Sequence, residues 1–190
     1  MPRTGDRKTQ ILQLIAQMLE APKGEKITTA ALAAKLDVSE AALYRHFASK
    51  AQMFEGLIEF IESSIFGLIN KITADETSGL KQAHAILAML ARFAAQNPGM
   101  TRVLIGDALV NENERLQARI NALMDKIESS LKQSLRVAVS AQELPETADV
   151  AAEANLLLCY MVGRWHQFAK SGFKKSPVDG LEKQLPLLLG

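Results

Sequence analysis

Residues 27–47 carry the sequence ITTAALAAKLDVSEAALYRHF, which predicts two short helices, over residues 30–36 and 40–47. Ser39 is a typical N-cap for the second helix. The break between the helices contains Asp37, and aspartate adopts the left-handed backbone of a tight turn more readily than most residues. Two short helices joined by a three- to four-residue turn form the pattern of a helix-turn-helix.

This motif predicts contacts with DNA, because its second helix enters the major groove with its first residues toward the base edges. Ala41 and Ala42 offer apolar contacts, and Arg45 has the geometry for a bidentate contact with guanine. The other candidates can reach phosphates, which position a protein without reading sequence; they are Thr28, Thr29, Ser39, Tyr44, His46 and Lys50. The alternative is a helix pair packed for structural reasons alone.

The rest of the chain also has helical periodicity, so we predict an all-α fold. Further helices are expected over residues 8–19, 50–72, 80–96, 100–110, 114–139, 148–170 and 181–189. We predict two domains, a helix-turn-helix DNA-binding domain at 1–48 and a helical dimerisation and partner-binding domain at 49–190. The helix that begins at residue 50 would join them without a flexible linker.

Composition places the chain among ordinary globular proteins, with 48% hydrophobic and 23% charged residues. The net charge of +1 hides an asymmetry, because residues 1–50 hold eight Lys or Arg against five Asp or Glu. A basic end suits a nucleic-acid contact. A single cysteine, no signal-peptide pattern and no long apolar run predict a cytoplasmic protein without a membrane span.

Enzymatic chemistry finds little support in the sequence. The three histidines, His46, His84 and His166, are far apart and have no metal-ligand spacing. We therefore expect no catalytic residue, no metal and no cofactor. Cys159 lies in an apolar run and is expected to be a small buried residue. Trp165 and His166 either line a ligand cavity or pack in the core or an interface.

Two apolar residues stand apart from the inward-facing stripes of their helices. Phe60 lies about 120° from the stripe of the helix at 50–72, and Met89 lies on the flank of the next helix. Displaced apolar residues on neighbouring helices indicate a surface groove in which a peptide could lie. The alternative is that this flank packs against another helix of the same chain.

Residues 10–60 resemble the TetR family of transcriptional regulators, whose hallmark is a Tyr-x-His-Phe-x-Ser-Lys run, here Tyr44 to Lys50. Later motifs are similar to the nucleoid occlusion factors of that family. These motifs are NPGxTRxLxGxAL at 97–109, RLQxRIN at 115–121 and FKKxP at 173–177.

The resemblance implies a homodimer, formed through residues 148–189, that binds palindromic double-stranded DNA across the nucleoid and assembles further on it. It also implies capture of the C-terminal tail of FtsZ, the division protein, in the groove described above. The expected tail contacts are Phe60, Ser64, Met89, Arg92, Gln96 and Asn97. A ligand-responsive repressor is the alternative function, and it would need a closed, mostly apolar pocket of roughly 300–1,000 Å³.

Overall fold

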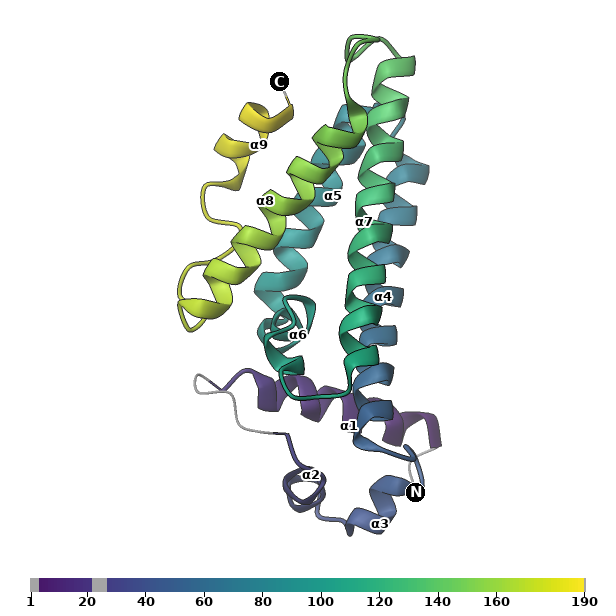
Figure 1. Ribbon diagram of the computed structural model, residues 1–190, viewed down its shortest axis with the longest axis vertical. Coiled ribbons are helices and arrows are strands. Elements are labelled where there is room, and N and C mark those ends of the chain that lie inside the picture. The colour runs from purple at the N-terminus through teal and green to yellow at the C-terminus, as the bar shows by residue number, and fades with distance from the viewer. Residues whose placement is uncertain (1–3, 22–26, 190) are drawn as a thin grey trace. The chain divides into compact units, whose positions relative to one another are not determined.

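The computed structural model describes residues 4–21 and 27–189, and within these ranges it is helical and contains no strand (Figure 1). This confirms the predicted fold class. The predicted stop of the first helix, at residues 22–24, lies outside the described residues. The elements are α1 (Thr4–Leu19), α2 (Thr29–Lys35), α3 (Glu40–Tyr44), α4 (Lys50–Asp75), α5 (Gly79–Gln96), α6 (Pro98–Leu104), the 3₁₀ turn η1 (Asp107–Leu109), α7 (Glu114–Ser140), α8 (Val150–Lys170) and α9 (Leu181–Leu189).

The chain packs as two compact units. We call residues 1–61 with 97–120 the head unit, and residues 62–96 with 121–190 the body unit. Helices α4 and α7 each contribute residues to both units. Packing therefore does not divide the chain at residue 48, and the division into functional domains at that residue stays a proposal. In the described part of the chain, no helix has the length and apolar character needed to cross a bilayer.

The head unit is held together by a close contact between α1 and α6. Ile11 and Ile15 of α1 are fully buried. Gly99 of α6 lies so near α1 that an added Cβ would be 1.8 Å from the Ala16 carbonyl oxygen. Pro98 occupies the first turn of α6, where its missing N–H costs no hydrogen bond. The NPG part of the motif at 97–109 thus has a packing explanation.

Two predicted helices are shorter in the structure. Helix α3 ends at Tyr44 and not at residue 47, because the chain must leave the helix before α4 is capped. At this cap the Ser49 hydroxyl accepts from the Gln52 N–H at 3.2 Å, and the Gln52 side-chain oxygen accepts from the N–H of Ala48, the residue before the cap, at 2.8 Å. The helix predicted at 100–110 is divided into α6 and η1 by Gly106, whose φ is +77°.

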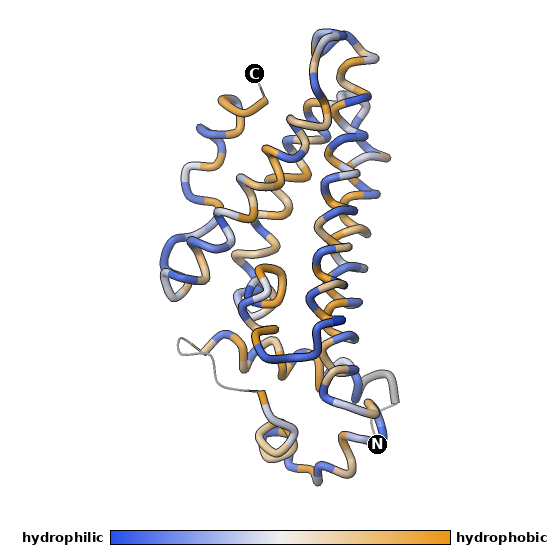
Figure 2. Tube along the Cα trace, in the orientation of Figure 1, coloured by the Kyte–Doolittle hydropathy of each residue, from blue (hydrophilic) through white to orange (hydrophobic). Residues whose placement is uncertain are grey.

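In the body unit, α5 packs against α8 and α9, and hydrophobic and hydrophilic residues alternate along α7 (Figure 2). The inward stripe predicted for α5 is confirmed, since Ile86, Leu87 and Leu90 are fully buried. On α4 the outcome differs: the periodicity predicts that Leu68 faces inward, but Leu68 is 43% exposed and Ile69 is buried instead.

The start of α5 is capped from a distance. The Glu143 carboxylate accepts a hydrogen bond from the Leu80 N–H at 2.9 Å, and this bond is the main cause of the lowered pKa of Glu143. The carboxylate thereby satisfies a backbone donor that the helix itself leaves without a partner.

Candidate nucleic-acid interface

The helix-turn-helix forms as predicted, Ser39 caps its second helix, and Thr28 caps the first. The Thr28 hydroxyl accepts from the Ala31 N–H at 3.1 Å, and the Ser39 hydroxyl accepts from the Ala42 N–H at 3.3 Å. Asp37 between the helices has a φ of +52°, the left-handed conformation expected for this turn. Since a hydroxyl donates as well as accepts, Thr28 and Ser39 can still donate to a phosphate while they cap.

The outer face of α3 and Arg45, which follows it, are open to solvent. Ala41 and Arg45 are exposed, Tyr44 is 46% exposed and Ala42 is half-buried. Arg45 stands just after the last turn of α3, as its C-cap. The sequence-predicted base-reading residues therefore lie together on one accessible surface.

His46 and Lys50 are less accessible than the spacing alone suggests. His46 is half-buried and its Nδ1 atom is enclosed, so that atom is not open to a phosphate. The Lys50 ammonium forms an ion pair with Glu112 and lies 5.7 Å from the centre of the Phe54 ring. A phosphate would have to compete for Lys50 with Glu112, which lies 62 positions further along the chain.

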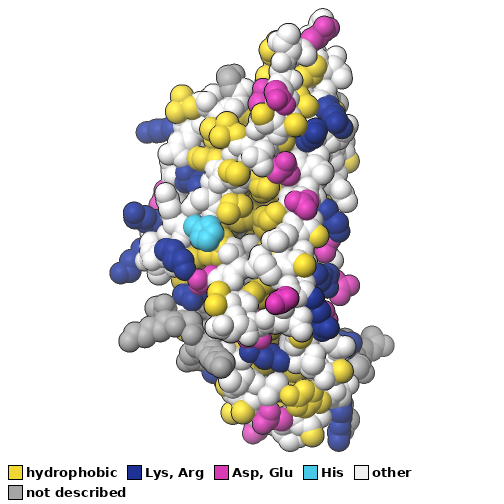
Figure 3. Space-filling view, in the orientation of Figure 1, with side chains coloured by type: hydrophobic (Ala, Val, Ile, Leu, Met, Phe, Trp, Pro, Cys, Tyr) yellow, Lys and Arg dark blue, Asp and Glu magenta, His cyan; other side chains and the backbone are white. Residues whose placement is uncertain are grey.

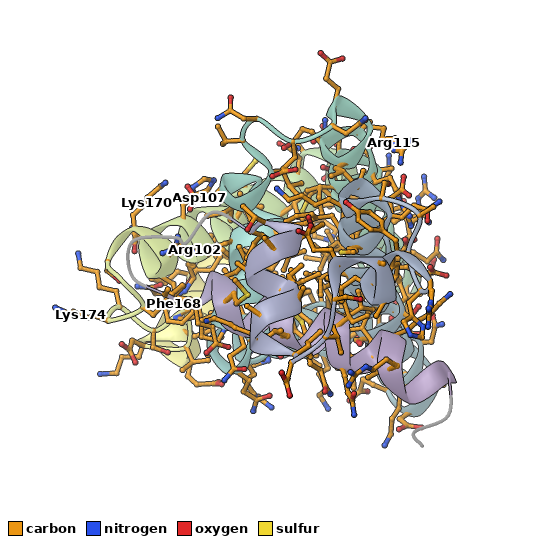
Figure 4. The ribbon with its side chains drawn as sticks, turned by 90° about the horizontal axis from the view of Figure 1, so that it is seen from below. Arg102, Asp107, Arg115, Phe168, Lys170 and Lys174 are labelled. Atoms are coloured by element: carbon orange, nitrogen blue, oxygen red, sulfur yellow. The ribbon has the colours of Figure 1, made fainter. Side chains whose placement is uncertain are left out.

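A second ion pair joins the same parts of the head unit. Arg115, in the first turn of α7, contacts the Glu55 carboxylate of α4 at 2.8 Å. Arg102 of the motif at 97–109 is buried, and its guanidinium lies 3.6 Å from the Asp107 carboxylate (Figure 4). Arg102, Asp107 and Arg115 were not predicted as site residues, and these pairs give them a structural explanation.

The predicted partner-binding residues divide between the two units. In the head unit, Phe60 is 43% exposed and lies beside a small apolar depression. The depression is also lined by Thr9, Leu12, Gln13, Leu57 and Met100. Asn97 is half-buried in the same unit.

In the body unit, Arg92 and Gln96 are exposed on α5, whereas Met89 and Ser64 are half-buried. The flank of α5 that carries Met89 is therefore at the surface, as its displacement from the buried stripe predicts.

Three residues weighed for chemistry are also placed by the structure. Trp165 is completely buried, as expected for a core residue, and His166 is exposed. Cys159 is exposed, so its predicted burial is wrong. Residues 156–160 form more than one full turn of α8, so their side chains point to all sides of the helix. Only the side that bears Leu157 and Leu158 faces the body core. No three His, Cys, Asp or Glu side chains of the described residues form a group able to hold a metal ion.

Comparison with known proteins places the sequence in a family. Residues 24–57 match the model of the bacterial regulatory proteins of the tetR family, and residues 77–190 match the SlmA-like tetracyclin repressor-like C-terminal domain. The chain is 50% identical over 179 residues to the nucleoid occlusion factor SlmA of Idiomarina loihiensis, covering 94% of this chain and 91% of the relative. It is 48% identical over 186 residues to that of a Marinomonas species, covering 98% and 94%.

The chain belongs to the SlmA family of nucleoid occlusion factors. SlmA proteins are members of the TetR family, so this chain is a DNA-binding regulator and not an enzyme. The SlmA-like match spans most of the body unit and part of the head unit, including the motifs at 97–109 and 115–121.

Solved structures agree on the fold. A TetR regulator from Haloarcula marismortui superimposes with a TM-score of 0.82 at 13% identity, covering 97% of each chain. The fatty acid degradation regulator FadR from Bacillus halodurans gives 0.81 at 16% identity, covering 100% of this chain and 97% of that one. At these identities the likeness supports the fold and leaves the ligand of the SlmA-family body undefined.

Proposed function

We propose that this chain is a cytoplasmic, nucleoid-associated homodimer that binds palindromic DNA and, once bound, captures the C-terminal tail of FtsZ. Division-ring assembly would thereby be blocked over the nucleoid. The observation that carries the proposal is identity of about half over nearly the full length of SlmA relatives. The FadR regulator from Bacillus halodurans shares the fold at only 16% identity.

The proposed DNA contact begins with the exposed face of α3. Arg45→Ala should weaken binding to the specific duplex by about 1–3 kcal/mol, because a bidentate contact with guanine is lost. Binding to an unrelated duplex should change far less. Titrations of both duplexes, followed by fluorescence anisotropy at one salt concentration, measure the difference.

The matched control is Arg136→Ala, which removes an exposed arginine from α7 of the body unit. It should leave both affinities unchanged. If Arg45→Ala lowers specific and non-specific binding by the same factor, Arg45 contacts only phosphate. Lys50→Ala is expected to act in that uniform way, with a small effect because Lys50 is already paired with Glu112.

The proposed partner contact uses Phe60, Ser64, Met89, Arg92, Gln96 and Asn97. Phe60 combines large exposed apolar area with a neighbouring depression, a surface that an apolar tail residue can cover. Burial of such area contributes about 25 cal/mol per Å². Arg92 is exposed and can pair weakly with an acidic tail residue.

Phe60→Ala and Met89→Glu should each abolish binding of a labelled FtsZ tail peptide while DNA binding is kept. The first removes apolar contact area, and the second places a charge on an apolar surface. Fluorescence anisotropy of the peptide, with and without the specific duplex, measures the effect. Val110→Ala, which truncates a 68% exposed apolar residue outside the predicted set, is the control.

Normal peptide binding by both variants would contradict the proposed groove. A wild-type protein that ignores the peptide with and without DNA would contradict FtsZ capture altogether. The ligand-responsive repressor would then be the better account.

The proposed dimer uses the outer face of α8, where hydrophobic side chains gather in Figure 3. Exposed residues recur on this face at steps of three and four, which is one side of a helix. They are Ala152, Leu156, Cys159, Gly163 and His166. Helix α9 adds Leu187, which is 83% exposed. Apolar and small side chains at helical spacing are suited to pairing with the same face of a second copy.

A further inference from the structure

Glu40, the first residue of α3, is an acidic side chain on the surface that we propose faces DNA. It is exposed on the same short helix as Ala41, five positions before Arg45. Its carboxylate is held in place: the Thr29 hydroxyl, from the first turn of α2, donates to Glu40 Oε2 at 2.5 Å. The bond connects the two helices of the motif and restricts where the carboxylate can point.

A carboxylate in this position would be repelled by phosphates, so its effect on binding depends on whether a donor faces it. In the major groove the available donors are the amino groups of cytosine and adenine. Guanine and thymine present only acceptors at the corresponding positions. An ionised carboxylate has no hydrogen to donate. Oε2 already accepts from Thr29, so Oε1 is the oxygen with more accepting capacity left for a base.

We propose that Glu40 is a specificity-determining residue that accepts a hydrogen bond from a base amino group, cytosine above all, in each half-site. Thr29 is then a positioning residue, because its hydroxyl aims the carboxylate while its own contact with DNA is secondary. This inference rests on the proposed docking of α3 in the major groove. Glu40 would distinguish bases that present an amino donor from bases that present only acceptors, whereas Arg45 would select guanine.

The test selects binding sites from a random-sequence duplex pool with the full-length wild type and with Glu40→Ala and Glu40→Gln. Duplexes built on the wild-type consensus then measure affinities for all four base pairs at each half-site position. Wild type should prefer cytosine over guanine or thymine at one position. Glu40→Ala should reduce that preference by at least about fivefold, the lower end of the discrimination by a direct base contact. Glu40→Gln should move it toward adenine, since a carboxamide both donates and accepts.

Two further variants separate reading from charge and from folding. Glu59→Gln removes an exposed negative charge from α4 of the head unit and should leave every preference unchanged. Thr29→Val removes the hydroxyl and keeps the shape, and it should weaken the cytosine preference without changing the preferred base at other positions. Preference is a ratio of affinities, so a uniform loss of folded protein does not move it.

Glu40 variants that keep the wild-type preference and bind all duplexes more tightly would overturn the proposal, because Glu40 would then only repel phosphates. An unchanged preference with lower thermal stability would also overturn it, because the bond between Thr29 and Glu40 would then serve only to hold α2 and α3 together. If wild type enriches no palindrome at all, the proposed docking of α3 fails, and the Glu40 proposal fails with it.

Discussion

Gly163→Leu is expected to convert the protein to a monomer and to weaken its binding to a palindromic duplex by about 100-fold or more. Gly163 lies on the exposed face of α8, and no described atom lies within 4 Å of the Cβ that a substitution would add. The single chain therefore has room for leucine. In a twofold interface the change occurs twice, and two bulky side chains would meet where the helices approach. Loss of the second head removes the gain from bivalent binding.

Sedimentation velocity and band-shift titration on the palindrome measure this result. Helix content should be kept, since leucine is a better helix former than glycine by about 1 kcal/mol. Gly67→Leu is the matched control: Gly67 is an exposed glycine of α4 that also has open space around it. A Gly163→Leu protein that sediments as a dimer on its palindrome would place the interface elsewhere.

The second large effect concerns stability. Gly99→Ala should lower the free energy of unfolding by about 3 kcal/mol, toward the upper end for an overpacked core. The new methyl group would lie 1.8 Å from the Ala16 carbonyl oxygen and 2.8 Å from the carbonyl carbon of the same residue. Backbone atoms cannot rotate away as a side chain can, so α1 and α6 would have to separate. Urea unfolding followed by circular dichroism measures the change.

Gly67→Ala serves as the control for this substitution as well. With open space around it, the added methyl should raise stability by about 0.5–1 kcal/mol, the usual gain over glycine inside a helix. Equal unfolding midpoints for Gly99→Ala and wild type would mean that the contact between α1 and α6 is looser than the structure indicates.

Local patterns were sufficient to predict most of the fold. The helices, the cap at Ser39 and the turn at Asp37 depend on side chains and backbone groups a few residues apart. The periodicity also identified the buried stripe of α5. Displacement from that stripe identified the exposed flank with Arg92 and Gln96.

Local patterns failed where distant or competing groups decide the outcome. Helix α3 ends early because residues 48 and 49 belong to the N-cap of α4, where they bond to Gln52. The chain has to leave the helical conformation before it reaches that cap. Cys159 was expected inside because an apolar run does not show which of its sides meets the core. Cys159 lies on the outer face of α8, which we propose packs against a second copy of the chain.

By itself, the sequence determined an all-helical chain with a helix-turn-helix and the motifs of its family, because spacing and capping are properties of neighbouring residues. Only the tertiary structure showed that Glu112 holds Lys50, that Thr29 holds Glu40 and that Gly99 leaves no room for a methyl group. Each of these facts depends on a contact between separate segments. Such contacts are set by how helices pack in three dimensions, and no periodicity along the chain encodes them.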